Sequence, residues 1–559
     1  MRYWLSVVGV LVGTSLVAIG FTACGGGSGS GGSNEATSAP SSTATPQPGL
    51  PAVPEEMRTV VSYETLLNQE APIPPQCYTR TQDQFNPCYT CHQAYDSSRG
   101  YRMNKLNDGH LQGQYAFSEV GLVNHWQNLF IDKSAFVERI SDDAILRYVS
   151  EDNYSGLAAR LHDRHWGGFI PDLDDYEKGA AAFDDHGFAR DGSHWVAFNY
   201  KPLPSTFWPT NGSTDDVLVR LPAEFREFSG SYVRDIYLAN LALLEMAIKD
   251  LDEISLPPVD ESALQMDVDG NGVLEQNVRR MLRRDFYLGD ADRVSLIRQQ
   301  FPEGTQFLHS VRYVGVDEQQ GIGVSTRMKE LRYMKKIRVM SEADLESRYA
   351  RERKEKVDQQ LPRYVSRGDL GFENGMGWII QGFIEDYDGE LRPQTYEESM
   401  FCMGCHAAIG TTIDQTFAFG RKVTGEAGWG YINLRGMVDA PNVGGTEGEI
   451  LEYFRRVNGG SEFRENAEIQ SRWFSDGELD EAAVAAADVY ELITPSAHRA
   501  LELNKAYTWL VRHQSYIYGR DANTRPVKNV YEQVDNEQPP LAAEFRRNDW
   551  DMRLSWPAE

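Results

Sequence analysis

The chain has 559 residues, of which 41% are hydrophobic and 25% are charged, a globular composition with room for more than one core. Its formal net charge is −27, and so acidic a protein repels phosphate backbones, which excludes nucleic acid as the expected partner. The same charge attracts basic proteins and cations.

The N-terminal segment, residues 1–23, predicts export. An apolar run extends to Phe21, and the small residues Thr22 and Ala23 precede Cys24. This arrangement resembles a bacterial lipoprotein signal, in which the cysteine becomes the lipidated first residue, although Phe21 stands where such signals more often have Leu. An uncleaved membrane anchor is the alternative, because an apolar run of about 18 residues spans a bilayer.

Residues 24–56 are rich in Gly, Ser, Thr and Pro and have no apolar period, which predicts a flexible tether. Gly25 follows the cysteine in place of the Asp that marks inner-membrane retention in lipoproteins. The lipoprotein resemblance therefore implies an anchor in the outer membrane, with the protein on its periplasmic side or at its surface.

Residues 57–225 contain the first of two C-x-x-C-H motifs, Cys88-Tyr89-Thr90-Cys91-His92. This spacing is the attachment signature of c-type haem. Two thiols three positions apart each add to one vinyl group of the same porphyrin, and the next residue supplies an imidazole to the iron.

Residues 226–300 are expected to be helical, with an amphipathic helix over 231–251 followed by a calcium-like loop. The stretch "DVDGNGVLE" matches the first nine residues of an EF-hand loop, with Gly272 at the sharp turn. It departs from that loop at position 12, which is Val278 and not Glu, so Asp260, Glu261 or Asp285 is needed to complete the site. An Asp/Gly turn without an ion is the alternative. The expected Ca²⁺ ligands are Asp267, Asp269, Asn271, the Val273 carbonyl and Glu275.

Residues 301–395 predict strands, with a charged helix over 341–361 between them. The segment 377–394 carries a Tyr-Asp-Gly turn between two apolar runs, which is typical of a hairpin. Residues 396–559 hold the second motif, Cys402-Met403-Gly404-Cys405-His406, and further helices over 476–493 and 495–519. The fold class expected is α+β and mostly helical, with c-type haem-binding segments and a smaller strand-rich portion.

Other chemistries explain the two cysteine motifs less well. Zinc needs four ligands gathered together, and the two pairs stand far apart in the chain. A thioredoxin-type dithiol has no need of the histidine, and a simple disulfide has none either.

At these two motifs the chain resembles bacterial dihaem c-type cytochromes. The resemblance implies two covalent haems, electron transfer in the cell envelope, and redox partner proteins such as basic cytochromes. The rival function is a dihaem redox enzyme of the peroxidase type, in which one haem keeps an open or weakly held sixth position, and a third is a binding module with structural haems. The resemblance implies thioether anchors at Cys88, Cys91, Cys402 and Cys405 and axial iron ligands at His92 and His406.

The sixth iron ligand separates a carrier from an enzyme. Downstream of the first motif the candidates are Met103, His110 and His125. For the second haem, Met437 lies in a Pro-containing loop that resembles the methionine loop of small monohaem cytochromes. The alternatives are an ordinary core methionine at that position and the rival ligands His498 and His513.

Overall fold

The computed structural model describes residues 49–557, apart from 81–83, 95–102, 116, 206, 407, 460–463, 465, 536–537 and 539–541. Cys24, the signal-like segment and most of the tether lie outside the described residues. Residues Pro46–Glu559 form one unit, separate from Met1–Thr45. Among the described helices, none combines the length and the apolar character needed to cross a bilayer.

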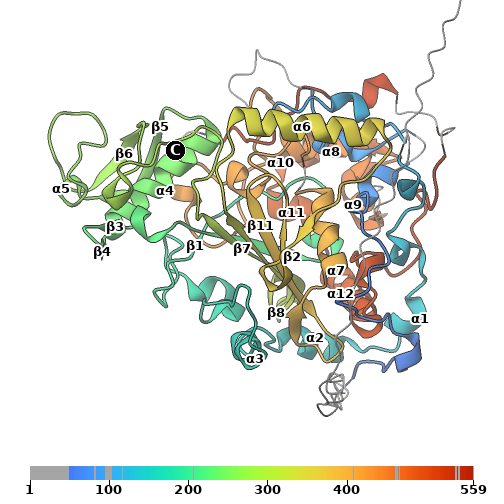
Figure 1. Ribbon diagram of the computed structural model, residues 1–559. Coiled ribbons are helices and arrows are strands. Elements are labelled where there is room, and N and C mark those ends of the chain that lie inside the picture. The colour runs from blue at the N-terminus through green and yellow to red at the C-terminus, as the bar shows by residue number, and fades with distance from the viewer. Residues whose placement is uncertain are drawn as a thin grey trace, which may run out of the picture. The chain divides into compact units, whose positions relative to one another are not determined.

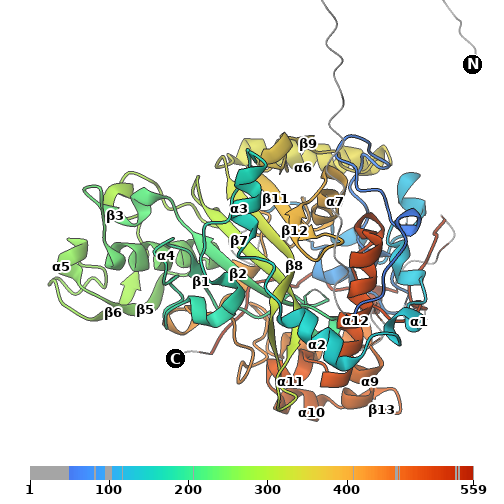
Figure 2. The same cartoon turned by 90° about the horizontal axis from the view of Figure 1, so that it is seen from below.

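An eight-stranded antiparallel sheet forms the centre of the second unit (Figures 1 and 2). The strand order is β1-β2-β7-β8-β11-β10-β9, and β12 pairs with a further part of β11. Its strands are β1 (Val196–Ala197), β2 (Thr214–Arg220), β7 (Gln306–Val316), β8 (Ile322–Lys336), β9 (Val365–Ser366), β10 (Phe372–Glu373), β11 (Trp378–Glu385) and β12 (Leu391–Pro393).

The long hairpin of β7 and β8 separates two hydrophobic cores. Successive side chains of a strand point to opposite faces of a sheet. Phe307 accordingly packs in the largest core together with Met334, whereas its neighbour Leu308 packs in a second core together with Leu331. Both faces of the central strands are therefore covered.

Helices and small hairpins surround this sheet, with α12 and α2 packed against β7. Three two-stranded ribbons accompany them: β3 (Glu227–Phe228) with β4 (Ser231–Tyr232), β5 (Glu253–Val259) with β6 (Val278–Leu282), and β13 (Phe474–Ser475) with β14 (Glu478–Leu479). The helices are α1 (Ser134–Val137), α2 (Asp142–Ser150), α3 (Leu157–Asp163), α4 (Arg234–Lys249), α5 (Glu261–Leu264), α6 (Glu342–Val357), α7 (Tyr396–Met400), α8 (Glu449–Val457), α9 (Ala467–Trp473), α10 (Glu481–Ala486), α11 (Val489–Ile493) and α12 (Ala497–His513).

Several predicted elements are present. The helix expected over 231–251 is α4, and the hairpin expected over 377–394 is formed by β11 and β12. The segment 476–493 forms two short helices where one was expected. The Asp488 side chain caps the second of them by accepting a hydrogen bond from Glu491 N (2.8 Å), which starts a new helix at that point.

The expectation of a mostly helical fold with a smaller strand-rich portion is wrong. Strands between residues 196 and 393 join one large sheet, and many connections are single 3₁₀ turns or irregular backbone. Hydrophobic periodicity identifies a single strand from its own residues. The pairing of β2 with β7 joins segments that are distant in the chain, so it cannot be predicted from the residue pattern of either strand. No haem-binding segments are shown as separate units of the fold.

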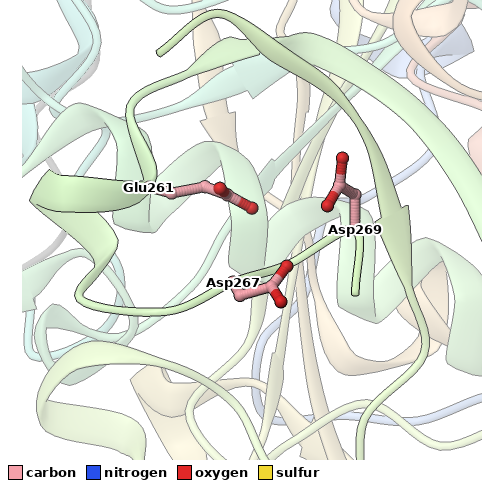
Figure 3. A group of neighbouring side chains, drawn as sticks. All are labelled: Glu261, Asp267 and Asp269. Carbon is pink, nitrogen blue, oxygen red and sulfur yellow. The ribbon is translucent and has the colours of Figure 1, made fainter. Parts of the chain in front are cut away.

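An acidic loop lies between α5 and β6, in the connection between the two strands of the β5–β6 ribbon. Its residues, 267–275, follow the short helix α5, and the carboxylates of Glu261, Asp267 and Asp269 face one another there (Figure 3). The loop has no helix on its C-terminal side, so the EF-hand resemblance is confined to the loop itself.

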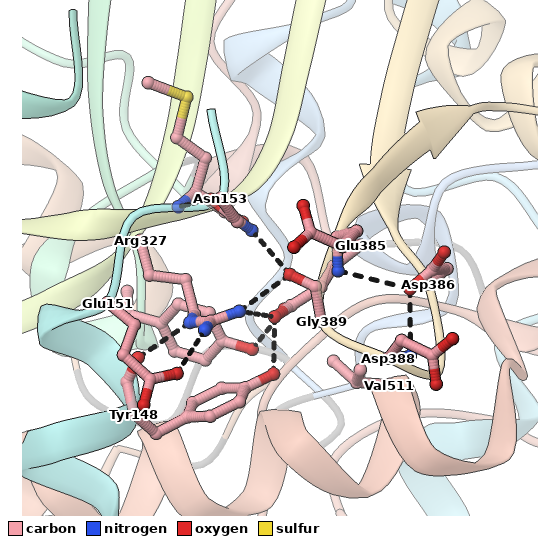
Figure 4. A network of polar contacts seen from close by, with 12 residues as sticks. Tyr148, Glu151, Asn153, Arg327, Glu385, Asp386, Asp388, Gly389 and Val511 are labelled. Carbon is pink, nitrogen blue, oxygen red and sulfur yellow. Dashed lines mark hydrogen bonds and ion pairs between the residues drawn. The ribbon is translucent and has the colours of Figure 1, made fainter. Parts of the chain in front are cut away.

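A buried ionic network fastens α2 to the central sheet (Figure 4). Glu385 of β11 is fully buried and accepts hydrogen bonds from the Tyr148 hydroxyl, the Tyr313 hydroxyl (2.6 Å) and Arg327 Nη1 (2.9 Å). Arg327 also donates to Glu151 Oε2 (2.7 Å). Burial raises the pKa of Glu385, and Arg327 opposes this shift. The guanidinium is therefore the group that stabilises a negative charge at this position.

Replacing this guanidinium is expected to destabilise the protein strongly. Arg327→Met leaves the Glu385 carboxylate buried without its countercharge, which costs about 3–5 kcal/mol of unfolding free energy. Urea denaturation followed by tryptophan fluorescence measures the loss. The matched control is Arg280→Met, which breaks an exposed pair with Glu253 and costs about 1 kcal/mol or less. Equal losses in the two variants would contradict the role given to Arg327.

Candidate functional site

The first C-x-x-C-H motif forms a tight turn. Asn86 starts it, because its side-chain oxygen accepts a hydrogen bond from Cys88 N (2.7 Å), and a 3₁₀ turn follows over Pro87–Thr90. Cys91 N and His92 N both donate to the Cys88 carbonyl, at 3.2 and 2.9 Å. These bonds bring the side chains of the two cysteines and the histidine to one side of the chain.

The second motif repeats this geometry at the end of α7. Cys405 N and His406 N donate to the Cys402 carbonyl at 3.2 and 3.0 Å, within a 3₁₀ turn over Phe401–Gly404. The Thr395 side chain caps α7 in a capping box with Glu398, which fixes the direction from which the chain enters the motif. The two motifs therefore share one local structure.

The fold brings the two motifs to one cavity of about 820 Å³. All four motif cysteines and both motif histidines line it. Its other walls include the proline-rich segment 72–77, which contains Cys77, and one face of the central sheet. That face contributes Asp215 and Val217 from β2 and Phe307, His309 and Val311 from β7, which are alternate residues of each strand as the pleat requires.

Backbone contacts join the two motifs directly. Thr411 N, just past the second motif, donates to the Cys91 carbonyl (3.2 Å), and Gly410 N donates to Asp108 Oδ2 (3.1 Å). The Asn104 side chain donates to the Ile409 carbonyl. One hydrogen bond between main-chain groups and two from or to side chains therefore hold the segments of the two motifs together.

Each motif histidine is held through its Nδ1. His92 Nδ1 lies 3.1 Å from Asp108 Oδ2, and His406 Nδ1 lies 2.9 Å from the Gln415 carbonyl oxygen. Metal-bound histidines are oriented by such a hydrogen bond on the ring nitrogen that does not bind the metal. In both residues Nε2 is then the nitrogen suited to an iron ligand.

Desolvation keeps several of the motif side chains neutral. Desolvation lowers the pKa of His406 to about 4, so its imidazole is uncharged at neutral pH. Desolvation also raises the pKa of Cys88 to about 12 and of Cys405 to about 12, so these thiols are protonated. Such an environment suits an apolar ligand.

A shared zinc site does not fit this arrangement. Within the described residues, the group whose ligand atoms lie within 4.8 Å of one another is Glu261, Asp267 and Asp269, none of which lines the cavity. The cysteine and histidine atoms of the two motifs do not gather in this way. The two motifs therefore line one cavity but do not form the tetrahedral set of four ligands that zinc needs.

The structure places two of the candidate sixth ligands, His110 and Met437, in different surroundings. His110 lines the cavity. Met437 packs in the main hydrophobic core, 6% exposed, and is not among the residues that line the cavity. The position of Met437 in a Pro-containing loop was the only signal for it, and core packing accounts for that position.

His309 also belongs to the site, although no sequence motif contains it. This residue of β7 lines the cavity, and its Nε2 is buried without a hydrogen-bond partner, 3.4 Å from Asp215 Oδ2. A signal was available, because His309 alternates with Leu308 in a predicted strand and so faces away from the second core. Only the pairing of the strands shows that the opposite face borders the motifs.

The acidic loop holds the side chains expected for calcium, with one addition from outside. Asp267 accepts hydrogen bonds from Gly270 N and Gly272 N, at 2.7 and 2.8 Å, and Gly272 has the positive φ of 90° that such a turn needs. Glu261, one of three residues considered outside the loop, supplies the buried carboxylate. The predicted ligands Asn271 and Glu275 instead bond to each other, through Asn271 Nδ2 and Glu275 Oε2 at 2.8 Å.

Comparison with known proteins identifies the family. Residues 61–489 match the family described as "-like lipoprotein". The chain is also similar to an "Uncharacterized lipoprotein" of Aquifex aeolicus (strain VF5), with 31% identity over 532 residues that cover 84% of this chain and 89% of the relative. No solved structure matches.

These findings confirm the expectation of a lipoprotein, which is an exported and membrane-anchored protein, and they correct the other resemblance. The family match spans both C-x-x-C-H motifs and most of the chain between them, whereas the likeness to dihaem cytochromes rested on the two motifs alone. Membership among the dihaem c-type cytochromes is therefore wrong, and the chain belongs to this lipoprotein family.

Proposed function

We propose that this lipoprotein attaches two haems covalently and carries electrons in the cell envelope. One haem would be anchored by Cys88 and Cys91 and the other by Cys402 and Cys405. The observation that carries the proposal is the convergence of both C-x-x-C-H motifs on one cavity, although they stand far apart in the chain. Bound haem supplies one-electron chemistry at its iron.

The histidines and the walls of the cavity supply what the cofactor requires of the protein. The hydrogen bonds at Nδ1 hold His92 and His406 with Nε2 available to iron. A volume of about 820 Å³ lies near the top of the range of about 300–1,000 Å³ for small-molecule sites. Cys88 is buried and the other motif cysteines and histidines are partly buried, which limits the access of water, and burial is one of the means by which a protein tunes haem.

Two arginines that line the cavity provide positive charge with which the carboxylates of the porphyrins would pair. Arg332 and Arg520 line the cavity, and both pair with the buried carboxylate of Glu330 at 2.9 Å. The single carboxylate of Glu330 therefore neutralises only one of the two guanidinium charges. The surplus charge favours anionic groups at this end of the cavity.

An electron carrier is favoured over a peroxidase-type enzyme by the histidines of the cavity. His110 and His309 line it in addition to the two motif histidines, so imidazoles are available for sixth positions. Two six-coordinate irons suit electron transfer, whereas an enzyme needs one open position.

The location and the partners follow from the sequence. Lipidation at Cys24 and the absence of Asp after it favour the outer membrane, and the tether over 24–56 holds the domain off that membrane. A net charge of −27 favours basic redox partners.

A second proposal is that the acidic loop binds Ca²⁺. The observation that favours it is the approach of three carboxylates, from Glu261, Asp267 and Asp269, to within 4.8 Å of one another. Like charges at this distance repel, and a hard cation bound by oxygen relieves the repulsion. The role of the ion would be to fix this surface loop.

Intact-mass measurement tests the haem proposal. Protein matured in a host with c-type haem attachment is expected to have the mass of the chain plus two haems and to keep its colour in acidified acetone. Cys88→Ser with Cys91→Ser, and Cys402→Ser with Cys405→Ser, each remove one haem. Cys77→Ser is the matched control, since Cys77 lines the same cavity outside both motifs, and it should retain two. A bare-chain mass for the wild type would refute the proposal.

Electron paramagnetic resonance tests whether His309 is the sixth iron ligand of one haem. We expect two low-spin ferric haems in the wild type and one high-spin haem in His309→Ala, because the variant loses an imidazole that lines the cavity. His162→Ala, an exposed residue of α3, is the control and should leave the spectrum unchanged. A wild type with a high-spin haem that reacts with peroxide would favour the enzyme instead.

Thermal unfolding tests the calcium proposal. Millimolar Ca²⁺ is expected to raise the melting temperature of the wild type, because a ligand that binds only the folded state stabilises it. Asp267→Asn should abolish this increase. Asp317→Asn serves as the control, because Asp317 also accepts backbone hydrogen bonds in a turn but lies outside the acidic loop. An increase of the same size in all three proteins would argue against the site.

A further inference from the structure

The two motif histidines donate to chemically different acceptors. His92 Nδ1 lies 3.1 Å from the carboxylate of Asp108, and Asp108 is 1% exposed. His406 Nδ1 meets the neutral carbonyl of Gln415 at 2.9 Å. The two motifs are alike in their local hydrogen bonds and differ at this contact.

The Asp108 carboxylate is fixed in place. Its Oδ2 also accepts from Gly410 N (3.1 Å), and its Oδ1 accepts from Gln93 N (2.8 Å). A side chain at position 410 has no room, since a Cβ there would stand 2.4 Å from Asp108 Oδ1. Glycine at 410 thus permits the carboxylate to approach both motifs.

The Gln415 carbonyl is fixed by a turn. Ile413 N and Thr416 N exchange hydrogen bonds with the opposite carbonyls, at 3.1 and 3.0 Å, and Gln415 has a positive φ of 59°. This turn aims the carbonyl at His406. The acceptor is uncharged and cannot take over the imidazole proton.

On this basis we infer that the haem at the first motif has a lower reduction potential than the haem at the second, with Asp108 as the residue that sets the difference. The inference rests on the proposed function. A carboxylate at Nδ1 raises the basicity of the imidazole and so favours ferric iron, whereas a carbonyl does so less.

The consequence is a preferred direction for electrons inside the protein. His92 would hold the iron that gives up an electron and is oxidised, and His406 would hold the iron that receives the electron and is reduced. A one-electron donor protein would then be needed at the first haem and a one-electron acceptor at the second. Asp108 is a positioning residue in this account, because it acts through His92 and does not touch the iron.

Optical redox titration of the mature, two-haem protein tests the inference. We expect two one-electron waves, of which the lower is missing from the Cys88→Ser, Cys91→Ser variant and the upper from the Cys402→Ser, Cys405→Ser variant. Asp108→Asn keeps the shape of the side chain and removes its charge. The variant should raise the reduction potential of the lower-potential wave by about 59 mV or more, which is about a tenfold change in the ratio of reduced to oxidised haem. The potential of the other wave should stay unchanged.

Further variants separate a tuning role from a structural one. Asp108→Glu retains the charge and should keep the lower wave closer to that of the wild type than Asp108→Asn does. Gly410→Ala displaces the carboxylate without removing it and should also raise the lower wave. Asp521→Asn removes a different carboxylate that lines the cavity and pairs with Arg464, so it should leave the separation of the waves unchanged.

The outcomes distinguish this inference from the proposed function. Two attached haems with coincident waves, or an Asp108→Asn shift confined to the upper wave, would overturn the inference and leave electron transfer intact. A chain without covalent haem would overturn both.

Discussion

The carboxylate of Asp108 is the contact on which the site depends. It accepts hydrogen bonds from His92 in the first motif and from Gly410 just past the second, and so joins two segments that are remote in the chain. The adjoining bond from Thr411 N to the Cys91 carbonyl reinforces the same junction. Because a buried carboxylate needs several donors to remain charged, these partners stabilise one another, and loss of any one weakens the convergence of the motifs.

The central sheet turns that junction into a cavity. Alternate residues of β2 and β7 form one wall, and the remaining face of the same strands packs in a hydrophobic core. The sheet that provides this wall is fastened to α2 where the Tyr148 hydroxyl donates to Glu385 and Arg327 donates to Glu151, and such buried contacts help to hold a site in place. Acidic groups predominate in the chain as a whole, yet guanidiniums line the cavity, so the site differs in charge from its surroundings.

Local chemistry was predictable from the sequence, and long-range arrangement was not. The turns at Cys88–His92 and Cys402–His406, the helix α4 and the β11–β12 hairpin follow from short patterns of residues. The large sheet, the part of Asp108 and the exposure of His309 to the cavity depend on pairings between distant segments, which no local pattern encodes. Met437, which a loop pattern suggested as an iron ligand, packs in the main hydrophobic core, and this long-range packing is likewise not visible in the local pattern. Two short motifs were also too little to fix the family, which the match over 61–489 assigns to lipoproteins.

A crystal structure of the mature, haem-loaded protein tests the central claim most directly, namely that one cavity serves both C-x-x-C-H motifs. The account predicts two porphyrins between the motifs and the sheet wall, with iron bound by His92 Nε2 and His406 Nε2. Porphyrins held on opposite sides of the molecule, or motif cysteines without any bound group, would contradict it.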